Sequence, residues 1–411
     1  MNKAVKVRYY IESLCIYDFK QDEIINALYD LLNSLEDETV LTKQSRFFNL
    51  LSSHHSLRHY VSKLILTDDN VFTKAAVAGK CDELDPSILD GVKADLEKLE
   101  VIASISAEDI YKAEEDSDIA DVLKTMPKWN PNGRAMLPLT DNWAEHIEDL
   151  KSFHRTNGYG MFAKFVAFTW RNEEFVPITA IDSIRLTDLK NYEVQRGKVV
   201  DNTVAFISDL PANNVLLYGD RGTGKSSTVH AILNEYKDRG LRMIEISKGD
   251  INDLTMIREK ISDSPMKFII FIDDLSFDNH DDSFGELKAA LEGSLSGRQN
   301  NTLIYATSNR RHLIKENFSD RENDVNRSDT LQEELSLSDR FGLSITFINP
   351  DKKDFEDIVQ KIATDRELKS DMEKILFTAE QWARRRGGRS PRCARQFIDY
   401  VESCEKRNIE W

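Results

Sequence analysis

The segment GDRGTGKS, residues 219–226, follows directly on the apolar run VLLY at residues 215–218. It fits the pattern G-x-x-x-x-G-K-[ST], in which glycines let the backbone turn tightly and point its N–H groups at phosphate oxygens. The helix that starts at the end of such a loop adds the attraction of its positive amino end. We therefore expect a run of nine residues to bind phosphate groups: Gly219, Asp220, Arg221, Gly222, Thr223, Gly224, Lys225, Ser226 and Ser227.

A second segment supplies the carboxylates that a nucleotide site needs. The run KFIIFIDD at residues 267–274 is typical of a strand buried on both faces, and ligands collect at the carboxyl ends of such strands. Lys225 is expected to reach the β- and γ-phosphates, while Ser226 and Asp273 hold Mg²⁺. Asp274 is expected to orient the attacking water. The alternative for the two aspartates is a capping role without chemistry.

Strand-like runs alternate with helical ones from about residue 201 onward. The runs are VLLY (215–218), MIEIS (243–247), FIIFID (268–273), LIYATS (303–308) and SITFI (344–348). This alternation is typical of βαβ units and predicts an α/β fold with a parallel sheet covered by helices. The residues after Asn349-Pro350 have a helical pattern again.

The first part of the chain is acidic, poor in glycine and helical in its periodicity. Apolar residues recur there at three-to-four spacing: Ile24, Ile25, Leu28, Leu31, Leu32 and Leu35, then Val92, Leu96 and Leu99. We expect an acidic helical domain at residues 1–155, a transition segment at 156–200, a nucleotide-binding core at 201–349 and a helical lid at 350–411.

Composition limits the partners and the environment of the protein. The 411 residues carry 71 acidic and 55 basic side chains, a formal charge of −16, so direct binding of nucleic acid is not expected. Four scattered cysteines without a CxxC pair fit a reducing compartment. No apolar stretch has the length of a membrane span, and we expect a cytoplasmic protein without a membrane partner. His55 and His59 lack further ligands at zinc-binding spacing.

These motifs resemble those of the AAA+ ATPases and, in detail, the bacterial family called domain of unknown function 815. The matching stretches follow the family order: NNVLLYGDRGTGKSS (213–227), GLRMIEISKGD (240–250), FIIFIDDLSF (268–277), LKAALEGS (287–294), ATSNRRHLI (306–314), LSLSDRFGL (335–343) and RSPRCARQFID (389–399). The resemblance implies a P-loop core with a five-stranded parallel sheet flanked by helices, a C-terminal helical lid and a mainly α-helical N-terminal domain. It also implies ATP and Mg²⁺ as cofactors, and a homo-oligomer with nucleotide at its subunit interfaces.

The resemblance gives two polar residues a role by their position. Asn309 looks like sensor 1, the side chain that places water near the γ-phosphate together with Asp274. An aspartate at position 274 replaces the glutamate that is commoner in such ATPases, and its shorter reach suggests slow turnover or turnover only in an assembled complex. Arg340 resembles the arginine finger that acts on the neighbouring subunit's nucleotide. A surface ion pair with Asp339 or Glu334 is the alternative for this arginine.

The C-terminal part carries a further candidate. Arg392 resembles sensor 2, which reaches from the lid onto the phosphates. Pro391 departs from the family pattern, in which a small residue is more usual, and Arg389 and Arg395 remain alternatives. By the family's architecture, adenine is expected to lie against the apolar segment that enters the core, at Ile184, Leu186, Leu189 and Tyr192.

Two functions follow from this reading. The first is an ATPase that hydrolyses ATP to drive conformational change in a protein client or assembly. The second is a nucleotide-gated adaptor or loader, similar to helicase loaders, in which binding drives assembly and hydrolysis is incidental. A P-loop GTPase fits less well because the chain has no N-K-x-D motif for guanine. The client is not identified by the sequence.

Overall fold

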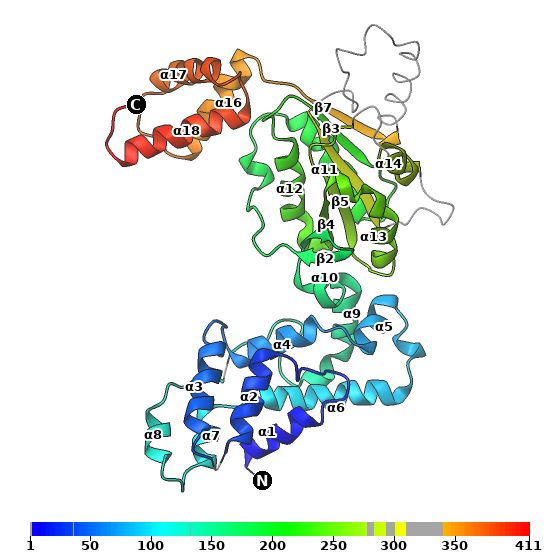
Figure 1. Cartoon of the computed structure of the whole chain (residues 1–411), viewed down its shortest axis with the longest axis vertical. Coiled ribbons are helices and arrows are strands. Elements are labelled where there is room, and N and C mark those ends of the chain that lie inside the picture. Colours follow the sequence, from blue (N-terminus) through cyan, green and yellow to red (C-terminus); the bar gives the residue numbers. More distant parts are fainter. Residues whose placement is uncertain (1, 36, 132, 278–282, 293–300, 310–339) are drawn as a thin grey trace. The chain divides into compact units, whose positions relative to one another are not determined.

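The chain folds into two compact units. The computed structural model describes residues 2–35, 37–131, 133–277, 283–292, 301–309 and 340–411. Unit 1 comprises Met1–Lys164 and unit 2 comprises Phe165–Trp411 (Figure 1).

The described residues of unit 1 form helices joined by loops, with no strand among them. Its helices are α1 (Lys3–Glu12), α2 (Glu23–Asn33), α3 (Val40–Leu51), α4 (Leu57–Leu66), α5 (Val71–Ala78), α6 (Pro86–Ala103), α7 (Ala107–Ala113), α8 (Ala120–Thr125), α9 (Ile147–Asn157) and α10 (Gly160–Lys164), with 3₁₀ turns η1 (Cys81–Glu83) and η2 (Trp143–His146).

The core of unit 1 follows from capping and apolar spacing. The Asp22 side chain accepts hydrogen bonds from the N–H groups of Ile24 and Ile25 and so starts α2. The apolar residues of α2 that recur at three-to-four spacing are buried: Ile24, Ile25, Leu28, Leu31 and Leu32. Asp95 of α6 is also buried, and its carboxylate accepts from three successive N–H groups after α1, those of Cys15, Ile16 and Tyr17.

Unit 2 is organised around a mostly parallel sheet. Its described strands are β1 (Ala167–Arg171), β2 (Glu174–Pro177), β3 (Val215–Gly219), β4 (Leu241–Ile246), β5 (Lys267–Ile272), β6 (Thr302–Ser308) and β7 (Leu343–Phe347). Their order is β2-β1-β4-β5-β6-β3-β7, and only β1 and β2 pair antiparallel. β3, which leads into the glycine loop, is therefore separated from β5 by β6.

The sheet corrects the expectation of five strands. Each of the five predicted runs forms a strand, but the described sheet has seven, because β1 and β2 come from the region predicted as a transition segment. Asn172 and Glu173 join them with φ values of 51° and 60°, as a two-residue hairpin turn requires. β1 then pairs with β4 and extends the parallel sheet.

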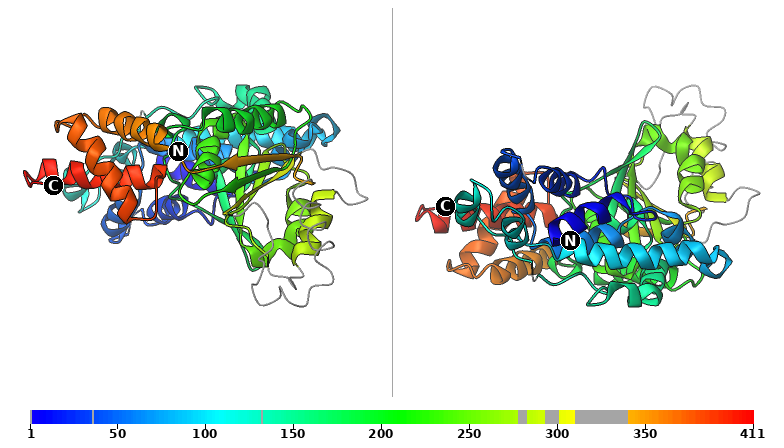
Figure 2. Two further views of the ribbon diagram at one scale, coloured as in Figure 1. Left: turned by 90° about the horizontal axis from the view of Figure 1, so that it is seen from above. Right: turned by 90° about the horizontal axis from the view of Figure 1, so that it is seen from below.

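Helices cover both faces of this sheet. α11 (Glu193–Ile207) and α12 (Lys225–Tyr236) share an apolar core with one face. α13 (Leu254–Ile261) and α14 (Ser283–Glu292) lie on the opposite face from α12 (Figures 1 and 2). Short 3₁₀ turns complete the unit: η3 (Leu186–Asp188), η4 (Lys237–Arg239) and η5 (Lys248–Asp253).

The last three helices form a C-terminal bundle with an apolar core of its own. They are α16 (Lys352–Asp365), α17 (Met372–Arg385) and α18 (Pro391–Lys406). Among the described helices of the whole chain, none combines the length and the apolar character that crossing a membrane requires.

Candidate functional site

The loop between β3 and α12 has a backbone that depends on its glycines. Gly219, Gly222 and Gly224 have φ values of 127°, 78° and 94°, in the region where other residues are strained. A Cβ atom at Gly219 would lie 2.0 Å from the carbonyl oxygen of Phe347 on β7, so only glycine fits there. α12 begins at Lys225, which places the amino end of a helix at the end of the loop.

Lys225 points back into this loop. Its side chain is almost fully buried, and Nζ donates to the carbonyl oxygens of Gly219 (3.0 Å) and Asp220 (2.8 Å) and to Oδ1 of Asn309 (3.1 Å). Burial lowers the pKa of the Lys225 ammonium from its usual 10.5. A desolvated ammonium whose hydrogen-bond partners are neutral oxygens favours the approach of an anion such as a phosphate.

The two residues predicted to hold Mg²⁺ are in contact. Ser226 Oγ donates to Asp273 Oδ1 over 2.6 Å. Because β6 lies between β3 and β5, this contact depends on all three strands ending at the same edge of the sheet. Hydroxyl and carboxylate oxygens suit Mg²⁺, which takes its other ligands from water and phosphate. In the described residues, no group of three or more His, Cys, Asp or Glu side chains could hold a metal ion.

Asn309 joins the loop to the second carboxylate. Its side-chain carbonyl accepts from Lys225, and its amide nitrogen donates to Asp274 Oδ1. Asn309 directly follows β6, and Asp274 lies two residues beyond β5 with a φ of 51°. The structure thus brings together the residues predicted to bind phosphate, to orient water and to act as sensor 1.

One contact residue of this cluster is missing from the sequence prediction. Thr307 of β6 donates its hydroxyl hydrogen to Asp273 Oδ1, and its hydroxyl oxygen accepts from the N–H of Asp274 over 3.0 Å. A threonine within an apolar run is ordinary for a strand, because β-branched residues favour that conformation. Nothing in the sequence therefore marks Thr307 as part of the site.

The arginines of the C-terminal bundle have different partners. Arg389 donates through Nε and Nη2 to the nearly buried carboxylate of Glu380, over 2.9 Å and 2.7 Å. Arg392 instead lies at the glycine loop, where its backbone N–H donates to the carbonyl oxygen of Gly222 over 3.1 Å. Of the arginines considered for sensor 2, Arg389 is therefore held by an ion pair within the bundle, whereas the start of α18 rests on the loop.

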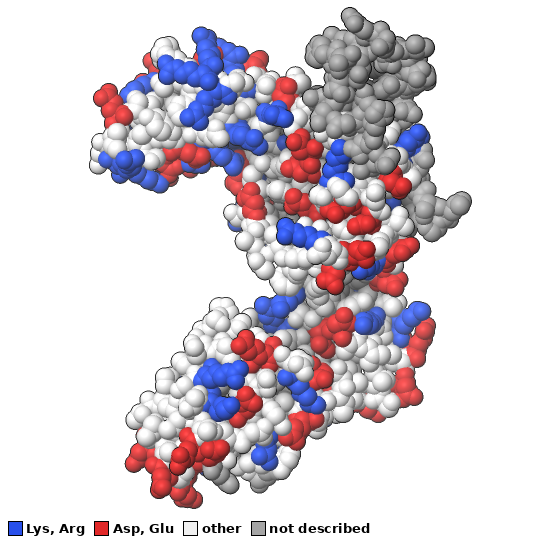
Figure 3. Space-filling view, viewed as in Figure 1, with Lys and Arg blue, Asp and Glu red and all other residues white. Residues whose placement is uncertain are grey.

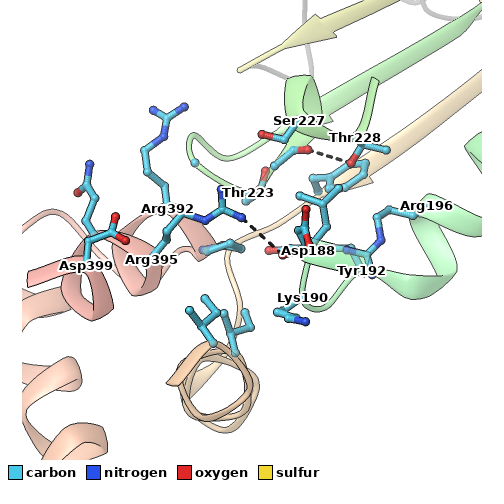
Figure 4. A pocket seen from close by; sticks show the side chains of 18 residues that line it. Asp188, Lys190, Tyr192, Arg196, Thr223, Ser227, Thr228, Arg392, Arg395 and Asp399 are labelled. Carbon is cyan, nitrogen blue, oxygen red and sulfur yellow. Dashed lines mark hydrogen bonds between the residues drawn. The ribbon is translucent and has the colours of Figure 1, made fainter. Parts of the chain in front are cut away.

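A pocket of about 320 Å³ lies between the loop and the bundle (Figure 4). Thr223 lines it from the loop, and Ile358 and Ile362 line it from α16. Arg395 reaches across from α18 toward the carbonyl oxygen of Asp188, at a long hydrogen-bond distance of 3.5 Å. The pocket therefore joins the glycine loop to an apolar wall, and its volume suits a small organic ligand.

The segment predicted to contact adenine reaches this pocket in part. Leu189 and Tyr192 belong to its lining, whereas Ile184 and Leu186 do not, although both are described. The Tyr192 hydroxyl donates to the carbonyl oxygen of Ile348 over 2.7 Å and so ties this segment to the end of β7.

Arg340 lies at the other edge of the sheet. It precedes β7, whose first residue pairs with the first residue of β3 and whose last residue pairs with Gly219. At the rise of a β-strand, this register puts about 13 Å between the loop and the first residue of β7, which is three residues after Arg340. Asp339 and Glu334, its alternative partners, lie outside the described residues.

The sequence also matches a known family. The model of a family described as protein of unknown function, DUF815, matches residues 163–405, which is more than half of the chain. The chain belongs to the DUF815 family. The match covers nearly all of unit 2, including the glycine loop, the two aspartates and the C-terminal bundle. A comparison of this DUF815 protein with curated proteins gives no significant match.

Solved structures show a weaker likeness to this DUF815 protein. A variant of RuvB from Thermotoga maritima has 18% sequence identity and a TM-score of 0.39, over 55% of this chain and 67% of that chain. The Thermotoga maritima RuvB Holliday junction branch migration motor has 17% identity and a TM-score of 0.38 over the same shares.

Proposed function

We propose that this DUF815 protein is an AAA+ ATPase that binds Mg²⁺·ATP at subunit interfaces and hydrolyses it to drive conformational change in a protein client or assembly. Residues 201–349 form the core, with β4, β5, β6, β3 and β7 as its five parallel strands. Residues 350–411 act as the lid. The acidic helical domain at residues 1–155, joined through residues 156–200, contacts the client.

The contact between Ser226 and Asp273 carries the proposal most directly. It places a hydroxyl and a carboxylate oxygen beside each other at the amino end of α12, next to the buried Lys225 ammonium. This is the arrangement that a metal-bridged triphosphate requires, because the lysine and the helix end attract the phosphates while the two oxygens share the cation. The bound Mg²⁺ would neutralise charge that develops on the phosphate oxygens.

Asp274 and Asn309 carry out the hydrolysis step in this proposal. Asp274 accepts the proton of the attacking water, and Asn309 holds that carboxylate by its amide nitrogen. Asn309 also contacts Lys225, so the water, the carboxylate and the γ-phosphate would be aligned by one side chain. The short aspartate side chain makes slow turnover the expectation.

Assembly completes the site. Because Arg340 lies at the opposite edge of the sheet from its own loop, it takes part by reaching the nucleotide of a neighbouring subunit. Arg392 of the lid contacts the loop through its backbone, and its guanidinium acts as the sensor of the bound phosphates. Motion of the lid would then follow the state of the nucleotide.

This proposal does not include nucleic acid as a direct partner. On the face that Figure 3 shows, basic and acidic side chains are interspersed on both units, with basic side chains most frequent on the C-terminal bundle. The net charge of −16 opposes binding to a polyanion unless a local patch overrides it.

A complementation experiment tests the proposal. Lys225→Ala removes nucleotide binding from a subunit but leaves its Arg340, whereas Arg340→Ala keeps nucleotide binding but removes the residue that acts on the neighbour. Each variant alone should hydrolyse no ATP, and a mixture should regain activity where one variant supplies the nucleotide and the other the arginine. Hydrolysis is measured by phosphate release at several protein concentrations, with GTP as the comparison nucleotide.

Two results would contradict this scheme. Full activity of Arg340→Ala alone would remove the arginine from the reaction. If the two variants assemble with each other but their mixture hydrolyses no ATP, the nucleotide site is not shared between subunits. ATP-driven assembly without turnover at any concentration would instead favour the nucleotide-gated adaptor, for which the aspartate at position 274 is the main support.

A further inference from the structure

Thr307 lies on β6, between β5, which precedes the two aspartates, and β3, which leads into the glycine loop. It is the penultimate residue of β6, is 2% exposed and has no place in the pocket beside the loop. β6 pairs with β5 on one side and with β3 on the other, so Thr307 stands between the strand of the carboxylates and the strand of the glycine loop.

The polar atoms of Thr307 hold three successive residues after β5. Its hydroxyl oxygen accepts from the N–H of Asp274, and its backbone carbonyl accepts from the N–H of Leu275 over 2.7 Å. Because a backbone N–H only donates, the hydroxyl must send its own hydrogen to its other partner, the carboxylate of Asp273. The direction of each hydrogen bond is therefore fixed.

Asp274 needs this support. Its φ of 51° lies in the left-handed region, which is strained for a residue with a Cβ atom. Strained backbone persists where the surroundings over-determine it, and Thr307 binds the N–H groups on both sides of the Asp274 α-carbon. The resulting turn presents the Asp274 carboxylate to Asn309, while Asp273 turns toward Ser226.

We propose that Thr307 is a positioning residue that sets the rotamer of the metal-binding Asp273 and the backbone conformation of the water-orienting Asp274 at the same time. This inference rests on the proposed ATPase function and deepens it. Thr307 acts through the two aspartates and contacts neither nucleotide nor metal.

Three variants separate this role from a general contribution to folding. Thr307→Val keeps the shape of the side chain and removes both hydroxyl bonds, and Thr307→Ser keeps the hydroxyl and removes a methyl group. Thr302→Val is the matched control, because Thr302 is a buried threonine at the other end of β6 whose hydroxyl, among the described residues, donates to Asn301 alone. Thermal unfolding reports the stability of each variant, and steady-state kinetics report kcat and KM for ATP.

The expected result is a split between kcat and KM. Thr307→Val should lower kcat about a hundredfold, as misplacement of catalytic groups does, while KM rises by no more than the roughly tenfold that Mg²⁺ adds to ATP affinity, because the loop and Lys225 are intact. Thr307→Ser should restore most of kcat. Thr302→Val should keep kcat even if it loses as much thermal stability as Thr307→Val.

Several outcomes would overturn the inference. They are an unchanged kcat for Thr307→Val, a Thr307→Ser variant as slow as Thr307→Val, or a Thr302→Val variant that is equally slow. If Thr307→Val does not fold, Thr307→Ala replaces it with the same expected kinetics.

A wild-type protein without turnover would contradict the proposed hydrolysis and not the role of Thr307. The readout is then the increase in ATP affinity that Mg²⁺ produces. Thr307→Val should lose this increase and Thr307→Ser should keep it, and an equal increase in both would overturn the inference.

Discussion

The substitution Gly222→Ala probes the contact between the glycine loop and the C-terminal bundle. Gly222 has a φ of 78°, and a Cβ atom built on it would lie 3.0 Å from Ser390 Oγ and 3.2 Å from Arg392 Cβ. Ser390 Oγ cannot move aside freely, because it caps α18 by accepting from the N–H of Cys393. The added methyl group must therefore push the start of α18 away from the loop.

The size of the effect follows from two contributions. The left-handed backbone conformation costs about 1 kcal/mol once a Cβ atom is present. Losing the hydrogen bond from the Arg392 N–H to the Gly222 carbonyl costs about 1 kcal/mol more. Gly224→Ala is the matched control, since Gly224 has a φ of 94° and no atom of the described residues lies within 4 Å of its added Cβ atom. It should show the first cost without the second.

Hydrogen exchange of the nucleotide-free protein measures the second contribution alone. The Arg392 amide lies in the first turn of α18, where N–H groups have no partner within the helix, so its protection comes from Gly222. In Gly222→Ala this amide should exchange about fivefold faster, the equivalent of about 1 kcal/mol, and in Gly224→Ala at the wild-type rate. Urea unfolding should rank Gly222→Ala as the less stable variant. Unchanged protection of Arg392 in Gly222→Ala would refute the reasoning.

Three further predictions rest on single side chains. Arg389→Ala should lower the thermal stability of the C-terminal bundle by leaving Glu380 with fewer partners. Arg392→Ala should weaken ATP binding with little loss of stability. If thermal unfolding and ATP titration give the opposite pattern, the roles of the two arginines are exchanged. Bound phosphate favours the charged form of Lys225, so ATP affinity should be at its maximum below the pKa that Lys225 has in the ATP-free protein and should fall as the pH rises through it. Since burial lowers that pKa, the fall should begin below pH 10.5. Fluorescence titration should show no such fall in ATP affinity for Lys225→Arg in this pH range. Burial raises the pKa of Asp68 in unit 1 from 3.8 in the unfolded chain to about 6 in the folded protein. The folded protein therefore loses stability as the pH rises from 3.8 to about 6, because the buried carboxyl must give up its proton. Asp68→Asn should thus raise the free energy of unfolding by about 1 kcal/mol at about pH 7.5, after allowance for solvent screening, and by nothing at about pH 3, as urea unfolding at both pH values would test.

The sequence predicts the strands of the core well because their apolar runs are continuous. β5, with residues Phe268 to Ile272 all buried, illustrates the pattern of a strand covered on both faces. β1 and β2 escape this reasoning, since β2 alternates between exposed and half-buried residues and its turn, Asn172-Glu173, lacks the glycine of a strong hairpin signal. Their place in the sheet depends on pairing with β4, which is far away in the sequence.

The site could be predicted residue by residue where a motif fixes the spacing. Lys225, Ser226 and Asp273 follow from two short motifs, and the structure brings the last two into contact. The role of Thr307 could not be predicted, because its hydrogen bonds form only when β6 lies beside β5. The order of strands in a sheet depends on pairing between distant segments, which the sequence of one segment does not show. The same holds for Arg389, which lies in the loop before α18 and whose partner Glu380 lies in α17.

The proposal that the glycine loop binds a triphosphate bridged by Mg²⁺ is tested most directly by calorimetric titration of ATP into the full chain, with and without Mg²⁺. For the wild type, Mg²⁺ should raise the affinity about tenfold or more, since the cation is the largest local charge in such a site. Asp273→Asn should keep the Mg²⁺-free affinity and lose the increase, and Lys225→Ala should bind in neither condition. No binding of ATP to the wild type, or an unchanged Mg²⁺ effect in Asp273→Asn, would contradict the account.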